Sequence, residues 1–458
     1  MLEFKKKIYP SWLHRISPPQ MMIIGFASVI LIGALLLTTP FASKDGHWTG
    51  FLDSLFTSTS AVCVTGLVVV DTGLHWSLFG KVIILLLIQI GGIGFMSLGA
   101  GIAVFLGMRI NLRQRMLIKE SLNQQELAGA VKLIKGVIHL TFFMEAVGAF
   151  LLSFDFIPKL GVTKGIWYSV FHSVSAFCNA GFDLFGEVNG PFTSLTGSYH
   201  SPVTILTISI LIILGGIGFP VMLCIHRKMR FDKYDLTSKL AIITTVILLI
   251  GGTLLFFAGE HNNGETLGNM SFFDKLINSF FQSVTTRTAG FNSVDLTKAK
   301  EGTLFMMMLL MFIGASPAST GGGIKTTTIA VLFLTFRAFL KNHKEITVYG
   351  KRIKTFVIRK SIGILVIGLT LITTATYILL MSQGHQFNLI SSGFEVISAF
   401  ATVGLSIAGS PNLNQLGKMV IIFLMFAGRV GTLTIFSLII KETKVKNVRY
   451  PETDVTVG

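Results

Sequence analysis

Long apolar runs separated by polar loops dominate this chain of 458 residues. A membrane-spanning helix needs about 20 mostly apolar residues, and eight runs approach or exceed that length. They lie near residues 21–39, 78–106, 133–154, 203–225, 239–258, 304–335, 361–381 and 418–440. The basic segment before the first run contains prolines, and no small-residue cleavage site follows the run, so we interpret residues 1–20 as a retained tail. The pattern predicts an all-α integral membrane protein with eight transmembrane helices.

Composition supports this class and excludes others. Hydrophobic residues make up 51% of the chain and charged residues 13%, and the mean hydropathy is +0.70. Soluble proteins contain about 25% charged residues, so a cytosolic enzyme, a disordered tail and a secreted disulfide scaffold are all excluded. The three cysteines are far apart and have neither CxxC nor Cys/His metal-ligand spacing.

The polar loops alternate between strongly basic and slightly acidic. The basic set comprises residues 1–20, 107–132, 226–238, 336–360 and 441–458; with its immediate flanks it contains 27 of the 38 Lys and Arg residues. Because Lys and Arg are retained in the cytoplasm, we expect both termini to be cytoplasmic. The net charge of +16 then becomes about +18 inside, −3 outside and +1 at membrane depth. It indicates topology, and we expect no nucleic-acid partner.

Four short apolar segments in the outer loops resemble one another. They read FTSTSAVCVTGL, FHSVSAFCNAGF, FFQSVTTRTAGF and FEVISAFATVGL, and each has a phenylalanine ten residues before its glycine. Those glycines are Gly66, Gly181, Gly290 and Gly404, spaced 115, 109 and 114 residues apart. A second glycine marker follows in the next apolar run, at Gly91, Gly215, Gly314 and Gly428. Internal repeats of this kind determine the architecture.

Each repeat is therefore expected to consist of a helix, a re-entrant half-helix, an extended glycine loop and a second helix. All four begin and end on the basic side, so they are parallel and imply a pseudo-fourfold axis. The expected organisation is a cytoplasmic N-terminal tail, four pore repeats, the third with a broken second helix, and a cytoplasmic C-terminal tail: 1–20, 21–107, 131–226, 236–340, 359–440 and 441–458. Non-helical backbone at membrane depth must be buried or line a water-filled cavity. Four such loops on one axis predict a pore.

The loop chemistry favours a monovalent cation. A filter for such an ion uses backbone carbonyls in place of its hydration shell, and glycine allows the backbone angles that this needs. The loops have no ring of acidic side chains, as a calcium site would need, and no ring of basic ones. The half-helices would direct the negative ends of their dipoles toward the ion.

The glycine loops CVTGL, CNAGF, RTAGF and ATVGL, together with IGASPASTGGGIKTTT at 313–328, resemble the Trk/Ktr/HKT superfamily of potassium transporters, and within it the Ktr-type membrane subunits. The resemblance covers about residues 20–440. It implies a potassium filter formed by the loop glycines and the two residues before each: Val64, Thr65, Gly66, Asn179, Ala180, Gly181, Thr288, Ala289, Gly290, Thr402, Val403 and Gly404. It also implies a homodimer and a cytosolic nucleotide-binding ring of RCK (KtrA-like) subunits.

The third repeat departs from the others after its filter loop. Its second apolar run contains Pro317 and three consecutive glycines, which disfavour a helix. Such a segment, on the cytoplasmic side of the filter, could swing and act as a gate; a static kink is the alternative. The family resemblance gives this gating role to Gly314, Ala315, Ser316, Pro317, Ser319, Thr320, Gly321, Gly322, Gly323, Lys325 and Thr326.

Three basic and two acidic residues are predicted at membrane depth: Arg287, Lys325, Arg429, Glu145 and Glu395. For Glu145, an inter-helix hydrogen bond is favoured over a role in a proton relay. Arg429 lies in the fourth repeat's second helix, where an intramembrane charge indicates function. Facing the cavity, it would hold the gating segment through its carbonyls and form an electrostatic barrier to cations, a role that the family resemblance also implies. Arg287 lies three residues before Gly290 and is expected to point behind the filter, with Glu395 as a partner that braces the loop.

The function indicated is potassium uptake across a bacterial cell membrane, with the lipid bilayer as surroundings. Potassium is the transported ion, and no bound organic cofactor is expected. The alternative is a sodium-coupled or sodium-permeable cation symporter. An intramembrane enzyme is disfavoured because no HExxH, GxSxG or paired intramembrane aspartates occur.

Overall fold

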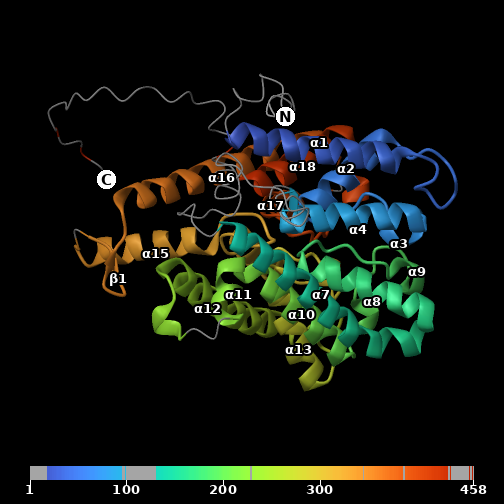
Figure 1. Cartoon of the computed structure of the whole chain (residues 1–458), viewed down its shortest axis with the longest axis horizontal. Coiled ribbons are helices and arrows are strands. Elements are labelled where there is room, and N and C mark those ends of the chain that lie inside the picture. The colour runs from blue at the N-terminus through green and yellow to red at the C-terminus, as the bar shows by residue number, and fades with distance from the viewer. Residues whose placement is uncertain are drawn as a thin grey trace, which may run out of the picture.

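The computed structural model describes residues 18–94, 98–99, 130–226, 230–343, 345–384 and 387–431, together with Thr434, Thr453 and Thr456. The helices lie side by side, with most of them along the long axis of the molecule (Figure 1). Most of the expected terminal tails and most of the basic loop 107–132 fall outside the described residues.

Four groups of helices follow one another along the chain. Each group begins with a long helix: α1 (Pro18–Thr38), α7 (Ala130–Leu160), α12 (Leu236–Glu260) and α16 (Thr355–Ser382). A shorter helix follows: α2 (Phe51–Val62), α8 (Val162–Phe177), α13 (Phe272–Thr285) and α17 (Leu389–Ala401). A third helix comes next: α4 (Leu78–Ile93), α10 (Pro202–Ile217), α14 (Glu301–Phe312) and α18 (Gln415–Val430).

Smaller elements complete the described structure. Three short helical segments accompany the groups, namely α3 (Thr72–His75), α9 (Gly186–Asn189) and α11 (Phe219–His226), and a further helix, α15 (Thr326–Leu340), follows α14. Single 3-10 turns are η2 (Thr196–Ser198), η3 (Phe231–Lys233), η4 (Leu296–Lys298) and η5 (Ser410–Asn412). Strands β1 (Thr347–Val348) and β2 (Lys351–Arg352) form an antiparallel hairpin between α15 and α16.

The groups contact one another in a closed order. The third helix of each group packs on the short helix of the next: α4 on α8, α10 on α13, α14 on α17, and α18 back on α2. Within a group, the short helix packs against the long one. In the first three groups a serine of the short helix donates to a carbonyl of the long helix, from Ser58 to Ile30, Ser173 to Glu145 and Ser283 to Leu249.

Four described helices are long and apolar enough to cross a membrane, namely α1, α7, α12 and α16. A fifth span results if α10 and α11, which are bent by 106° at their junction, are counted as one. The remaining apolar helices are shorter than a full span as described, so the count of eight stays a prediction. Large apolar side chains on the long helices are exposed, such as Leu35, Phe150 and Leu254, as expected of a surface that faces lipid.

The apolar runs 78–106, 203–225 and 418–440 each contain a glycine at which the described helix ends. The described helices end at Gly94, Gly218 and Gly431, where φ is +83°, +100° and +97°. Helical backbone requires negative φ, and glycine reaches these angles without a Cβ clash. A glycine three residues after the second marker thus ends these helices, while in the third group α14 ends at Phe312.

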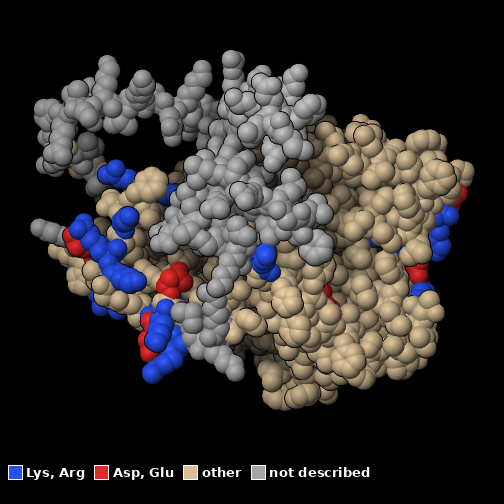
Figure 2. Space-filling view, in the orientation of Figure 1, with Lys and Arg blue, Asp and Glu red and all other residues tan. Residues whose placement is uncertain are grey.

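Charged side chains gather near the two ends of the visible face, with a broad zone of other residues between them (Figure 2). One such cluster joins three elements around Glu187 of α9. Lys81 of α4 and Lys164 of α8 lie 2.6 and 3.0 Å from its carboxylate, and the Tyr168 hydroxyl donates to it at 3.1 Å. Lys81 is nearly buried, so this ion pair is shielded from solvent on one side.

Replacing Glu187 by Gln is expected to destabilise the fold by about 2 kcal/mol at neutral pH, because Lys81 loses its charged acceptor. Partial burial of Glu187 opposes ionisation, but hydrogen bonds from Lys81 and Lys164 outweigh it and lower the pKa of Glu187 to about 2. The stabilisation is therefore complete above the usual carboxyl pKa of about 4.5 and is lost as the pH falls toward 2.

Thermal unfolding of detergent-solubilised protein between pH 3 and 7 measures this effect. The matched control is Glu265→Gln, since Glu265 pairs with Lys298 at 2.9 Å in a mostly exposed setting and should change stability by less than about 1 kcal/mol. Equal effects of the two substitutions, or a difference independent of pH, would contradict the assignment.

Candidate functional site

The four glycine loops adopt one repeated backbone conformation. Each follows the C-terminal end of a short helix, and each places two residues in the left-handed region. The first lies two positions before the glycine, with φ of +49° at Val64, +57° at Asn179, +70° at Thr288 and +52° at Thr402. The second is the glycine itself, with φ of +91° at Gly66, +71° at Gly181, +81° at Gly290 and +94° at Gly404. Left-handed non-glycine residues are uncommon, so their recurrence in four loops is a feature of the site.

The four glycines lie against one another in cyclic order. A Cβ built on Gly66 would lie 2.6 Å from the Ala180 carbonyl oxygen, and one on Gly181 would lie 2.6 Å from that of Ala289. On Gly290 it would lie 2.8 Å from the Val403 carbonyl oxygen, and on Gly404 it would clash with that of Thr65. Each loop thus presents its glycine to the carbonyl before the next glycine, and no side chain fits between them.

Hydroxyl groups of the short helices hold these loops, and sequence reasoning missed them. The Gly66 and Gly404 N–H groups donate to Ser60 and Ser398 at 3.0 and 3.1 Å. The Ser175 and Thr285 hydroxyls donate to the carbonyls of the residues after Gly181 and Gly290, both at 2.7 Å. A signal was present, since a Ser or Thr lies five or six residues before each glycine.

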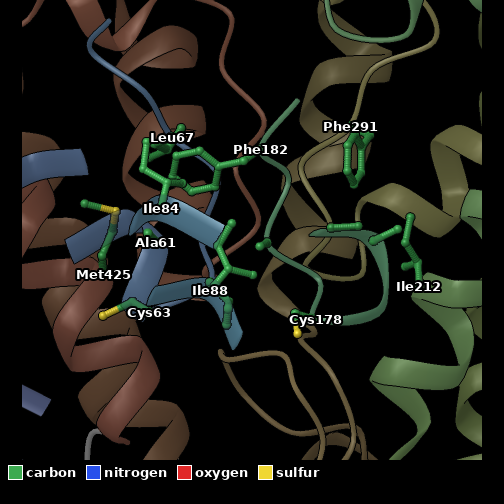
Figure 3. Close-up of a cluster of buried hydrophobic side chains, with 14 of the residues drawn as sticks. Ala61, Cys63, Leu67, Ile84, Ile88, Cys178, Phe182, Ile212, Phe291 and Met425 are labelled. Atoms are coloured by element: carbon green, nitrogen blue, oxygen red, sulfur yellow. The ribbon is translucent and has the colours of Figure 1, made fainter. Parts of the chain in front are cut away.

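The residue after each glycine anchors the loop in the protein interior. Leu67, Phe182, Phe291 and Leu405 are all nearly or fully buried. Figure 3 shows Phe182 beside Leu67 and close to Ile84 of α4, with Cys63 and Cys178 at the ends of their short helices. The apolar side chain points away from the loop backbone, so the carbonyl groups are left as the chemically active part of the loop.

The arrangement can bind a cation through oxygen atoms of the backbone. The short helices end at the loops, and the partial negative charge of a helix C-terminus favours a cation there. Among the described residues, no group of three or more His, Cys, Asp or Glu side chains could hold a metal ion. A monovalent ion needs no carboxylates and can exchange its hydration shell for carbonyl oxygens.

The segment between α14 and α15 leaves the helical path over residues 313–325. Its ends pair with each other, since Gly314 N–H donates to Ile324 at 2.9 Å and Ala315 N–H to Gly322 at 3.4 Å. Its middle is held by the second group: Ser316 and Thr320 N–H donate to the carbonyls of Gly216 and Gly215. The backbone groups freed by the break thereby find partners inside the protein.

The same segment touches the left-handed residues of the glycine loops. The Gly322 N–H donates to the Thr402 hydroxyl at 3.0 Å, and a Cβ on Gly321 would overlap the side chain of Thr288. A Cβ on Gly218, at the break after α10, would lie 2.6 Å from the Pro317 carbonyl oxygen. The glycines of the segment therefore permit close contact with the base of two loops at once.

Two cationic side chains hold this segment through its carbonyls. Arg429 of α18 donates to the Thr320 carbonyl from Nη1 and to the Gly91 carbonyl of α4 from Nη2. Lys325 Nζ donates to the Gly321 carbonyl at 2.7 Å. Arg429 thus connects the third, fourth and first groups, on the side of the loops where the segment lies.

The predicted brace between Arg287 and Glu395 is not formed. No ion pair joins them within the described part of the chain, and Arg287 Nη1 and Glu395 Oε2 are buried without hydrogen-bond partners there. The physical reason is their placement. Glu395 accepts a hydrogen bond from Ser410, while Arg287 lines a small cavity with residues of α10, α12 and α13.

The lone carboxylate of Glu145 on α7 lies between elements of two groups. Gln89 Nε2 of α4 donates to both of its oxygens, at 3.0 and 3.2 Å, and Cys178 Sγ lies 3.7 Å from one of them. Cys178 directly precedes the left-handed Asn179. This inter-helix contact is the hydrogen-bonded arrangement that the sequence favoured over a proton relay.

Comparison with known proteins finds similarity over nearly the whole chain. The family model described as "TrkH: Cation transport protein" matches residues 17–449. The chain is 41% identical to the potassium/sodium uptake protein NtpJ of Enterococcus hirae, over 97% of this chain and 98% of that protein. It is 40% identical to the Ktr system potassium uptake protein B of Bacillus subtilis, over 97% of each chain.

A solved structure shares the fold. The potassium transporter TrkH from Vibrio parahaemolyticus matches with a TM-score of 0.72, covering 95% of this chain and 86% of the other, at 18% identity. That identity supports the fold alone, whereas the sequence matches support the family. The resemblance noted in the glycine loops is confirmed: this chain belongs to the TrkH family of cation transport proteins.

Proposed function

We propose that this protein mediates potassium uptake across the bacterial cell membrane, through a filter of backbone carbonyls on a pseudo-fourfold axis. The carrying observation is the cyclic contact of Gly66, Gly181, Gly290 and Gly404 in four loops of one conformation. The packing of each group's third helix on the next group's short helix supports the same axis. The filter comprises these glycines with the two residues before each, and both termini are cytoplasmic.

Potassium is favoured over other cations by two observations. Relatives that match over nearly their full length are named potassium uptake proteins. The first loop has glycine at position 66, where a serine accompanies sodium preference in plant members of the superfamily that the loops resemble. The name of the Enterococcus hirae protein also includes sodium, so sodium coupling or sodium permeation is the second candidate function.

The segment Gly314–Thr326 is proposed as the gate. It lies against the left-handed residues of the third and fourth loops and reaches across to the break after α10. Several of its hydrogen bonds run to the second and fourth groups and not to a helix of its own group, so it can exchange these partners without unfolding a helix.

Arg429 is proposed as the barrier that keeps this gate closed. Its guanidinium group binds a carbonyl of the segment and a carbonyl of α4, so it holds the segment in place while adding positive charge beneath the filter. A cation leaving the filter would meet both the segment and this charge. An intramembrane charge in contact with backbone carbonyls, as here, typically marks an ion pathway.

The similarity to Ktr proteins also supports a multi-subunit assembly. Relatives named as part of a Ktr system support a partner subunit, which we propose is a cytosolic nucleotide-binding ring of RCK type bound to a homodimer of this chain. The basic residues of 336–360 and the hairpin of β1 and β2 are then candidates for contact with that ring or with anionic lipid headgroups.

Flux from proteoliposomes containing the purified protein, with and without the partner ring, tests the proposed function. We expect potassium flux to exceed sodium flux by at least about tenfold and to be independent of a sodium gradient. Sodium-dependent potassium flux would favour the symporter. No flux of either ion with the ring present would overturn the transport proposal.

Replacing Gly66 by Ser is expected to reduce potassium-over-sodium selectivity by about tenfold or more, because its Cβ would lie 2.6 Å from the Ala180 carbonyl oxygen and strain a φ of +91°. Ion competition for rubidium uptake measures the change. Gly46→Ser is the matched control, since Gly46 also has a positive φ of +70° but open space around it. Unchanged selectivity in Gly66→Ser would refute the filter assignment.

Replacing Arg429 by Ala is expected to raise potassium flux several-fold in the absence of the partner ring, because the segment loses its link to α4 and the barrier charge disappears. Stopped-flow flux in liposomes measures this. Arg230→Ala serves as control, since Arg230 forms an exposed ion pair with Asp232 at 3.3 Å. A flux equal to or below that of the unmodified protein, at equal reconstituted amounts, would count against the gate.

A further inference from the structure

Arg287 occupies a position where the other loops have small residues. Three residues before the loop glycines stand Cys63, Cys178 and Ala401, which are all fully buried. The guanidinium group of Arg287 lies in the same buried layer, with only 7% of the residue exposed. Arginine stays charged in proteins, so the third loop carries a buried positive charge next to the filter.

The side chain of Arg287 reaches a small cavity behind the filter. The cavity lies between α10, α12 and α13, and it is lined by Ile212, Ile213, Gly216, Thr245, Leu249, Val284 and Arg287. Two of these residues, Arg287 and Thr245, offer polar side chains, and the other walls are apolar. The space suffices for one small particle only.

Both polar groups of the cavity are unsatisfied. Arg287 Nη1 and Thr245 Oγ1 are buried, and neither has a hydrogen-bond partner among the described residues. Thr245 belongs to α12 and is 4% exposed, so the two groups come from different elements and face the same space. Buried polar groups are almost always paired, and an orphan requires a bound water, an ion or another explanation.

From this geometry we infer that the cavity binds one small monovalent anion of the size of chloride, held by the Arg287 guanidinium and the Thr245 hydroxyl. Both groups are hydrogen-bond donors. No described acidic residue forms an ion pair with Arg287, so its charge is otherwise uncompensated in a low-dielectric setting. A phosphate-bearing lipid headgroup is too large for the space. A water molecule would fit, but it is neutral and would leave the positive charge of Arg287 uncompensated.

The anion would also matter for the filter, a consequence that rests on the proposed function. The Arg287 carbonyl lies 3.4 Å from the side-chain amide of Asn179, so Arg287, which belongs to the third glycine loop, lies directly against the second. A bare positive charge there would repel a potassium ion in the filter, and a bound anion would cancel that repulsion.

Bromide substitution tests the site without reference to transport. Diffraction data collected at the bromine absorption edge, from crystals in which bromide replaces chloride, should show an anomalous peak beside Arg287 Nη1 and Thr245 Oγ1. The peak should be absent from Arg287→Gln crystals. An unmodified protein without a peak at saturating bromide would overturn the inference, and a water molecule would be the occupant.

Thermal stability in detergent provides a second measurement. Replacing chloride by gluconate, at constant potassium and ionic strength, should lower the melting temperature of the unmodified protein by several degrees. Thr245→Val, which preserves shape, should abolish most of that shift. Thr253→Val is the matched control on the same helix, because the Thr253 hydroxyl is satisfied by the Leu249 carbonyl at 2.7 Å, and it should retain the full shift.

A chloride-dependent shift of the same size in Thr245→Val as in the unmodified protein would refute the site. These readouts involve no ion flux, so they can succeed if potassium transport fails and fail if it succeeds. Where both succeed, chloride removal should reduce potassium flux several-fold in the unmodified protein and not in Thr245→Val.

Discussion

The contact of backbone with backbone among the four loop glycines is the constraint on which the rest of the structure depends. Extended chain inside a bilayer leaves polar groups that lipid does not satisfy, each at a cost of several kcal/mol. Here the loops lie against one another and are tied to their short helices by serine and threonine hydroxyls. Each short helix packs in turn against the long helix of its group. Glycine at the point of contact is required because any Cβ would meet a carbonyl oxygen of the next loop.

The proposed fourfold scheme has one altered member, so the proposed filter would be symmetric while the proposed gate would not. In the first, second and fourth groups, the third helix ends at a glycine with positive φ that lies three residues after the second glycine marker. The remaining one, α14, ends at Phe312, and a thirteen-residue segment runs to α15. That segment forms hydrogen bonds with the second and fourth groups. One interrupted helix in the third group therefore contacts two of the other three groups.

Buried charges in this protein are satisfied in different ways, and the differences follow from their neighbours. Arg429 binds two backbone carbonyls, so its charge serves as a bridge. Both carboxylate oxygens of Glu145 accept hydrogen bonds from the side-chain amide of Gln89. Arg287 has no such partner in the described chain and instead faces a cavity shared with Thr245. The last case is the one in which a ligand from outside the chain explains the chemistry.

The sequence alone determined the membrane class, the four registered loops and the position of the interrupted helix. These depend on apolar runs, on glycine and on proline, whose effects are local and visible in one dimension. The glycines that end three of the second helices were not identified from the sequence, because a glycine within an apolar run can either continue a helix or end it, and only its φ decides. The hydroxyls that anchor the loops were present in every repeat and were overlooked as ordinary helix residues.

The tertiary structure decided which side chains meet. Arg287 and Glu395 carry opposite charges on neighbouring repeats, yet Glu395 bonds to Ser410 while Arg287 faces a cavity between α10, α12 and α13. Likewise, only the folded chain brings Gly322 to Thr402 and Arg429 to Gly91. Long-range pairing of this kind depends on helix rotation and crossing, which hydrophobic periodicity does not specify to the accuracy of a hydrogen bond.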